Sequence, residues 1–179
     1  LFKDMEERVN KGVKLKDLIL SGFTGTFNSR YTNLLTKNNI EKVDSLLKEL
    51  DLTKIKNQEF YSLSDGQKRR AMMARALIYQ PKLLVLDEPF CNLDIKSYII
   101  LNKTLEKLIE NSVNIVYVTH SLETILPKTN RVILMKKGEI YNDGNPGELI
   151  NSKILSGLFN IDINVIKEGN YWRSISNNN

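Results

Sequence analysis

The stretch Leu83-Leu84-Val85-Leu86-Asp87-Glu88-Pro89 decides the fold of this chain, because a short apolar run ends at two adjacent carboxylates. A second apolar run lies at residues 115–119. The segment between the two runs carries apolar residues at helical spacing, namely Tyr98, Leu101, Leu105, Leu108 and Ile109. A strand, a helix and a strand in this order predict a crossover, with both strands buried and parallel in one sheet and the helix on one face. The predicted fold class is therefore α/β, a mainly parallel sheet with flanking helices.

The residues before the first strand favour helices. Three are predicted, over residues 13–20, over residues 40–50 with Asn39 as N-cap, and over residues 66–79 with Pro81 halting the helix. Residues 1–12 are polar and show no clear period. We therefore interpret residues 1–62 as a helical subdomain with its entry segment, and residues 63–150 as the core portion.

The residues after the second strand predict shorter elements. We expect a short helix around residues 121–126, a hairpin of strands at 132–135 and 140–141, and short helices at 148–150 and 154–159. The hairpin is expected to form an antiparallel edge of the same sheet. Residues 151–179 are interpreted as a C-terminal extension that ends in a frayed tail at residues 177–179.

Composition bounds the class of protein. The 179 residues (20.6 kDa) predict one compact unit, and no apolar run is long enough for a membrane span. The net charge of +5 would permit binding to nucleic acid or to a membrane surface, but the basic residues are scattered, so the charge selects neither. A single cysteine, Cys91, excludes a disulfide framework, and a single histidine, His120, excludes a cluster of histidine metal ligands.

Asp87 and Glu88 are the first candidate functional residues. They follow a buried strand, and open α/β sheets bind ligands at the carboxyl ends of their strands. Burying a carboxylate is costly without a cation or hydrogen bonds, so Asp87 indicates a nearby magnesium ion and Glu88 a base directed at water. The alternative is a pair of solvated carboxylates in a turn.

Two further candidates lie at element boundaries. The turn Leu63-Ser64-Asp65-Gly66-Gln67 opens a helix, whose free backbone N–H groups and positive dipole end favour a bound anion. The alternative is that Ser64 is only an N-cap. His120 directly follows the second apolar strand; a lone histidine is more often structural than catalytic.

The order of these candidates resembles the nucleotide-binding subunit of ABC transporters. Residues 63–67 are similar to the Leu-Ser-Gly-Gly-Gln signature, residues 83–88 to Walker B with its catalytic Glu, residues 92–94 to the D-loop, and His120 to the switch histidine. The resemblance implies part of a P-loop NTPase (ABC ATPase) fold with a helical subdomain. It departs from the family at Asp65, where Gly is usual, and a carboxylate there should point outward because it would repel phosphate.

The resemblance also implies roles. Nucleotide contacts would come from Leu63, Ser64, Asp65, Gly66, Gln67 and Asp94. Asp87 would hold Mg²⁺ through water, Glu88 would polarise the attacking water, and His120 would hydrogen-bond the γ-phosphate of ATP and orient Glu88. Asp94 would also carry contacts across a head-to-tail dimer with a second ATP-binding subunit.

The implied activity is ATP hydrolysis that powers a membrane transporter. Residues 13–60 would dock on transmembrane permease subunits, so the protein would be cytoplasmic and peripheral on the inner face of the membrane. The stretch at residues 18–23 is similar to importers of iron chelates. An alternative is a soluble ABC-type ATPase acting on nucleic acid or the ribosome, but no zinc-binding cysteine set or basic run with aromatics supports it, so no nucleic acid is expected. A non-catalytic regulatory module is the third reading.

The P-loop pattern Gly-x-x-x-x-Gly-Lys-Ser/Thr is absent from these residues. In the family that loop lies before the position that matches Leu1. Because the first residue is also not Met, we expect this sequence to be part of a longer chain, and we expect it to be inactive by itself.

Overall fold

The computed structural model describes residues 2–27 and 36–176 of the chain. These form two compact units, Leu1–Val118 and Thr119–Asn179, and each is described here by itself. The single compact unit predicted from chain length is therefore wrong, because each segment builds a core of its own. The division after residues 62 and 150 stays a prediction.

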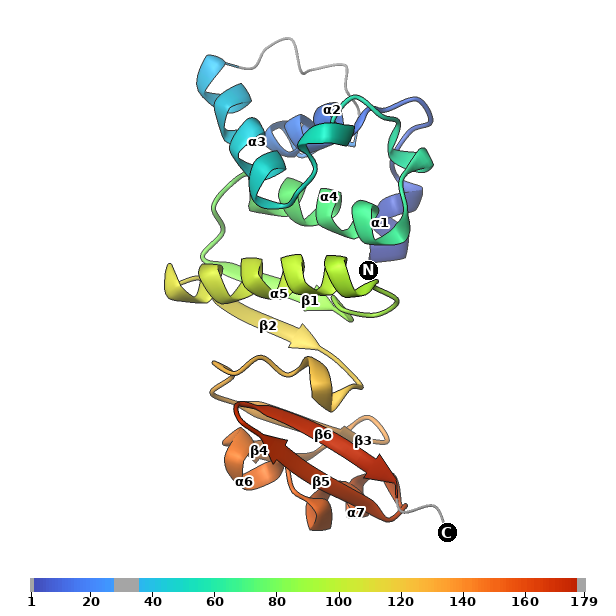
Figure 1. Cartoon of the computed structure of the whole chain (residues 1–179), viewed down its shortest axis with the longest axis vertical. Coiled ribbons are helices and arrows are strands. Elements are labelled where there is room, and N and C mark those ends of the chain that lie inside the picture. The colour runs from blue at the N-terminus through green and yellow to red at the C-terminus, as the bar shows by residue number, and fades with distance from the viewer. Residues whose placement is uncertain (1, 28–35, 177–179) are drawn as a thin grey trace. The chain divides into compact units, whose positions relative to one another are not determined.

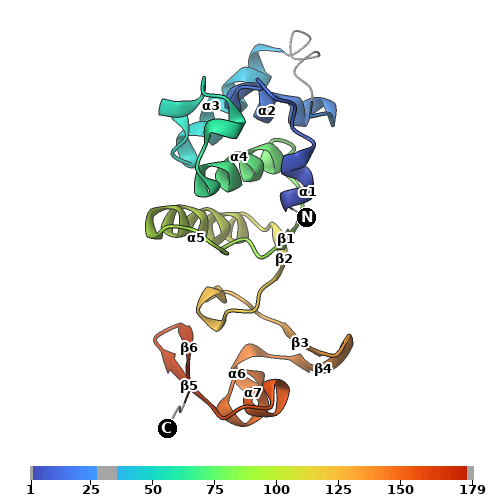
Figure 2. The same cartoon turned by 90° about the vertical axis from the view of Figure 1, so that its right-hand side faces the viewer.

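The first unit is mostly helical. Its helices are α1 (Phe2–Glu7), α2 (Leu15–Leu20), α3 (Lys37–Glu49), α4 (Asp65–Leu77) and α5 (Ile95–Glu110), with short 3-10 turns at Ser21–Thr24, Thr53–Ile55 and Phe60–Ser62. In Figures 1 and 2, α4 lies between α2 and α3 on one side and α5 on the other. The core residues Leu15, Leu18, Leu47, Phe60 and Met73 are almost completely buried between these helices.

Two helix starts differ from the prediction. α2 begins at Leu15 instead of Val13, because the Phe60 N–H donates to the Val13 carbonyl and the Leu15 N–H to the Gln58 carbonyl. α3 begins at Lys37, so Thr36 and not Asn39 is its N-cap. Asn39 is the third helical residue, and its Oδ1 accepts the Thr36 N–H at 2.9 Å in a capping box.

α1 was not predicted, since six residues offer too few positions for a period to show. It runs through residues 2–7, four of which are charged, before the turn at Gly12, whose φ is +80°.

The predicted strand, helix and strand are present. β1 (Leu83–Asp87) and β2 (Asn114–Val118) pair in parallel, with Leu83 opposite Asn114 and Asp87 opposite Val118, and α5 connects them. The prediction that both strands are buried is wrong. Leu84 and Leu86 are buried, but Val85 is 59% and Val116 is 55% exposed, because the described residues cover one face of this sheet.

The second unit consists of two hairpins and two helices. Its elements are the 3-10 turn η5 (Leu122–Thr124), β3 (Val132–Lys136), β4 (Glu139–Gly144), α6 (Pro146–Leu149), α7 (Ser152–Phe159), β5 (Ile163–Glu168) and β6 (Tyr171–Ser176). The β3–β4 hairpin confirms the prediction for these strands. It forms a sheet of its own, however, so its expected place at the edge of the β1–β2 sheet is wrong. Within residues 2–27 and 36–176, no strand joins the β1–β2 sheet to the β3–β4 sheet by hydrogen bonds.

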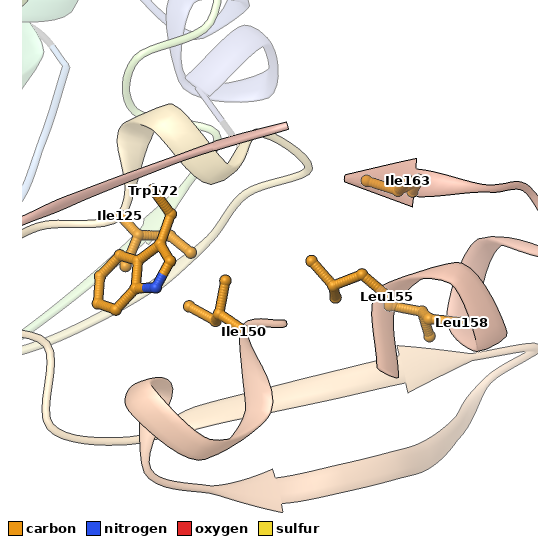
Figure 3. Close-up of a cluster of buried hydrophobic side chains, with 6 residues drawn as sticks. All are labelled: Ile125, Ile150, Leu155, Leu158, Ile163 and Trp172. Carbon is orange, nitrogen blue, oxygen red and sulfur yellow. The ribbon is translucent and has the colours of Figure 1, made fainter. Parts of the chain in front are cut away.

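The β5–β6 hairpin was not predicted. It turns at Gly169, whose φ is +61°, and it brings Trp172 into the core of the second unit. Figure 3 shows Trp172 near Ile125 and Ile150, with Leu155 and Leu158 on α7. Residues 151–176 are thus integral to this core, and the frayed tail predicted at 177–179 lies outside the described residues.

Candidate functional site

The turn at residues 63–67, called here the Ser64 turn, starts α4. Ser64 has an extended backbone (φ −66°, ψ 160°) and is the N-cap, with its Oγ accepting the Gln67 N–H at 3.4 Å. Gln67 Oε1 in return accepts the Ser64 N–H at 2.9 Å. Ser64 is therefore an N-cap, and its contact with a bound anion stays a prediction. A hydroxyl that accepts one hydrogen bond still carries its own proton, so the cap does not prevent Ser64 from donating to an anion.

Asp65 is exposed at the first helical position of α4. Its carboxylate is favourable there because the N-terminal end of the helix dipole is positive. The expectation that this side chain points away from a bound phosphate stays a prediction.

Gly66 is required by packing. A Cβ at this position would meet Ser97 Oγ, and it would lie 2.9 Å from Ser97 Cβ and 3.1 Å from Asp94 Oδ2. The backbone of the Ser64 turn therefore lies directly against the start of α5. The sequence indicated close approach to a ligand at Gly66, and the structure adds a close approach to another helix.

Asp94 is the N-cap of α5. Its Oδ1 accepts the Ser97 N–H at 2.8 Å and its Oδ2 accepts the Ser97 hydroxyl at 2.7 Å. These hydrogen bonds, first the backbone one, lower the pKa of Asp94 below its ordinary value. Arg70 of α4 donates to the same Ser97 hydroxyl. Sequence reasoning missed Arg70 and Ser97, although the Asp94-x-x-Ser97 spacing is that of a capping pair.

Asp87 and Glu88 lie at the carboxyl end of β1, as predicted. We call residues 87–94 the Glu88 turn. Glu88 has a positive φ of 46°, a conformation that a residue with a side chain rarely adopts. Its N–H donates to the Val118 carbonyl at 3.0 Å, and its own carbonyl accepts the Cys91 N–H at 3.2 Å. Cys91 is half-buried rather than fully buried.

Arg69 connects the two turns. Its guanidinium extends from α4 to donate to the Glu88 carbonyl. The Ser64 turn and the Glu88 turn are thus joined at two places, through Arg69 and through Arg70 with Ser97. The sequence contained Arg69 only as part of an Arg-rich helix, and no local pattern indicates which carbonyl it reaches.

His120 belongs to the second unit, which begins at Thr119. It is exposed, between the half-buried Thr119 and Ser121, and the Ser121 N–H donates to Thr119 Oγ1 at 3.1 Å. The two carboxylates belong to the first unit, so the link between His120 and Glu88 stays a prediction.

The donor set suits a magnesium ion held with a nucleotide. Among the described residues there is no group of three or more His, Cys, Asp or Glu side chains that could enclose a metal. Mg²⁺ usually keeps several waters and takes one or two carboxylates plus substrate phosphates, which the exposed Asp87 at the strand end can satisfy. In the part of the chain that the structure describes, no helix is both long and apolar enough to cross a bilayer.

Comparison with known proteins identifies relatives. The family described as "ABC transporter" matches residues 4–91. The Bacillus subtilis (strain 168) ABC transporter ATP-binding protein YlmA is 38% identical over 136 residues, which cover 73% of this chain and 50% of YlmA. The Fe(3+) ions import ATP-binding protein FbpC of Fusobacterium nucleatum is 38% identical over 110 residues, covering 60% of this chain and 29% of FbpC. The chain thus matches about half the length of the first relative and less of the second.

Solved structures give the same result for the fold. An inward-facing metal-chelate type ABC transporter has a TM-score of 0.74 at 24% identity, over 90% of this chain and 64% of that one. The protein cbiO1 from Clostridium perfringens, part of the transporter complex cbiONQ, has a TM-score of 0.64 at 28% identity, over 87% of this chain and 59% of that one. The described residues therefore form part of a P-loop NTPase fold of the ABC ATPase type.

Proposed function

We propose that this chain, which is part of an ABC transporter ATP-binding domain, supplies the Ser64 turn to one and Glu88 to the other of two composite ATP-hydrolysing sites that power import through a membrane transporter. The observation that carries the proposal is the connection of the Ser64 turn to the Glu88 turn by Arg69. A helix N-terminus suited to phosphate and a carboxylate suited to activate water are held in one rigid piece.

Each side chain has a role in this proposal. Glu88 polarises the water that attacks the γ-phosphate, and its backbone bonds to Val118 and Cys91 keep the carboxylate at the strand end. Asp87 holds Mg²⁺ through water; the ion would neutralise charge that develops on the phosphates. His120 orients Glu88 toward the γ-phosphate.

The other half of the site must come from a P-loop, because these residues contain none. Its backbone N–H groups and lysine would hold the phosphates of ATP. In a head-to-tail dimer the Ser64 turn of one subunit contacts the γ-phosphate held by the P-loop of the second subunit, and Ser64 and the backbone at Gly66 donate to it. Asp94 contributes contacts across the same interface.

The names of the relatives support a function in import. FbpC is named for import of Fe(3+) ions, and the Borreliella afzelii protein PotA, also 38% identical, for import of spermidine and putrescine. These names favour transport over action on nucleic acid or the ribosome. The partners are permease subunits docked on residues 13–60, which places the protein at the cytoplasmic face of the membrane. The cargo differs between relatives of equal identity, so the iron-chelate type stays a prediction.

The test is Glu88→Gln in the protein that carries this chain together with a P-loop. We expect ATP hydrolysis to fall by about 10²- to 10⁴-fold, because an amide keeps the shape but cannot polarise water. ATP binding should persist, and ATP should hold the variant in a dimer on size-exclusion chromatography.

Glu7→Gln is the matched control, since it removes an exposed carboxylate from α1 of the same unit, outside residues 13–60. It should hydrolyse ATP at the wild-type rate. Residual activity of Glu88→Gln within tenfold of wild type would reject Glu88 as the base. Wild-type protein that neither binds nor hydrolyses ATP would reject the proposed function altogether.

A further inference from the structure

A relay of three polar side chains joins α4 to α5. Arg70 donates to the Ser97 hydroxyl, and that hydroxyl donates to Asp94 Oδ2 at 2.7 Å. Arg70 is only 4% exposed and Ser97 only 2%. The hydroxyl thus acts as donor and acceptor at once, between a cation and an anion, and hydrogen bonds to charged groups are the stronger ones.

The relay lies where the two turns of the candidate site touch. Ser97 is the residue that a Cβ on Gly66 would strike, so its side chain fills the space between the Ser64 turn and α5. Asp94, at the other end of the relay, is the last residue of the Glu88 turn. A displacement of either turn must therefore either break the hydrogen bonds of Ser97 or move the other turn with it.

Burial makes the relay costly to break. Desolvation lowers the pKa of Arg70, while the nearby Asp51 and Asp94 raise it, and Lys96 pairs with Asp51 at 2.6 Å at the exposed rim. Arg70 Nε has no hydrogen-bond partner among the described residues. The guanidinium therefore depends on the few bonds it makes, because a buried charge without partners is strongly unfavourable.

We propose that Arg70 and Ser97 are positioning residues that make the Ser64 turn and the Glu88 turn move as one body. The inference rests on the proposed function, since the two turns serve the two composite ATP sites of the same dimer. It adds that a phosphate contact at the Ser64 turn is transmitted to Asp94, the residue assigned to contacts across the dimer, without passing through the nucleotide.

Amide hydrogen exchange on the nucleotide-free protein tests the coupling independently of ATP. In Ser97→Ala, the hydrogen-bonded amides of residues 67–70 and 97–100 should both exchange about tenfold faster, because the lost hydroxyl serves both helices. Thr104→Val is the matched control. Thr104 is equally buried on α5, but its hydroxyl donates to Ile100 within the same helix at 2.9 Å. It should leave residues 67–70 unchanged.

Faster exchange confined to residues 97–100 would overturn the proposal, as would the same effect in Thr104→Val. If Ser97→Ala does not fold, Arg70→Lys and Arg70→Met replace it. The lysine retains a cation that can reach Ser97, so it should protect residues 67–70 better than the methionine does. Equal exchange in the two variants would overturn the proposal.

Kinetics give the second readout. In Ser97→Ala, kcat for ATP should fall about tenfold with little change in KM, because a misplaced turn weakens the transition state more than the P-loop contacts that bind ATP. A raised KM at unchanged kcat would overturn the positioning role. If Ser97→Ala raises exchange at both helix starts but the wild-type protein has no ATPase activity, the proposed function is rejected and the coupling of the two turns still stands.

Discussion

Glu88 holds a left-handed backbone (φ 46°), which for a residue with a side chain costs about 1–3 kcal/mol. The hydrogen bonds to Val118, Cys91 and Arg69 offset that cost. Such strain persists only where surrounding contacts over-determine it, and it is concentrated at functional sites. The same three contacts fix the backbone of Glu88 directly after β1, which favours its assignment as the base.

At Gly66 a single methyl group should disturb the site. Gly66→Ala is expected to destabilise the first unit by about 1–3 kcal/mol, because the new Cβ overlaps Ser97 and must push α4 from α5. Gly144→Ala is the control, since its Cβ would approach Leu149 no closer than 3.6 Å. Urea unfolding gives the free energy of unfolding of both variants. An equally small loss in both would contradict the prediction, because it would mean that α5 moves aside from Gly66 at little cost.

Asp94 should make stability depend on pH. Its folded-state pKa lies below the ordinary 3.8, so its stabilising effect is complete well above pH 3.8 and is lost as the pH falls through the lowered value. Asp94→Asn isolates the charge, because asparagine is also a good N-cap. Its melting temperature should lie below wild type at pH 7, and the difference should shrink as the pH falls from 3.8 through the lowered pKa of Asp94. A difference that stays the same over this range would contradict the role of the carboxylate charge.

At the scale of elements, α4 and β1 differ in how they are buried. α4 is packed between α5 on one side and α2 and α3 on the other. It therefore buries residues on nearly all of its faces, including Gly66, Arg70, Ala71 and Ala74. β1 alternates, with Leu84 and Leu86 inward and Val85 outward. A continuous apolar strand is typical of a sheet covered on both faces, so the exposed face of β1 and β2 is the surface on which we expect association.

Neighbouring positions on β1 test this alternation. Leu84→Ala should cost about 2–5 kcal/mol of unfolding free energy, because it opens a cavity beneath α4 and α5. Val85→Ser should change stability little and should reduce self-association, since Val85 is 59% exposed. Urea unfolding and light scattering on both variants give the comparison. A large loss of stability in Val85→Ser would mean that the outer face is covered.

At the scale of the whole molecule, two cores stabilise two units. Leu47 is fully buried in the first, and Leu155 belongs with Trp172 to the second. Trp172 is the only tryptophan of the sequence, so its fluorescence reports on the second unit. The spectroscopic signal thus separates the units without any label.

We expect the two units to unfold separately. Leu155→Ala should lower the midpoint of the Trp172 fluorescence transition, by about 2–5 kcal/mol in free energy, and leave most of the helical circular dichroism in place. Leu47→Ala should do the reverse. If each variant shifts both signals equally, the chain unfolds as one cooperative unit and the expectation is wrong.

The sequence by itself determined the local elements and the identity of the candidate residues. The apolar runs at Leu84 and Val116 predicted β1 and β2. Helical spacing between them predicted α5, because a helix that buries one face shows a period in neighbouring residues. Ser64 was recognisable as a cap for the same reason. Its partner Gln67 lies three positions along the chain.

Only the tertiary structure decided what depends on residues distant in the chain. The Arg70–Ser97 and Arg69–Glu88 contacts, the packing of Gly66 on α5 and the left-handed backbone of Glu88 arise when α4 meets the end of β1. No local period encodes such contacts, because each side chain has many equivalent partners until the helices pack. The division at Thr119 likewise follows from which apolar residues share a core.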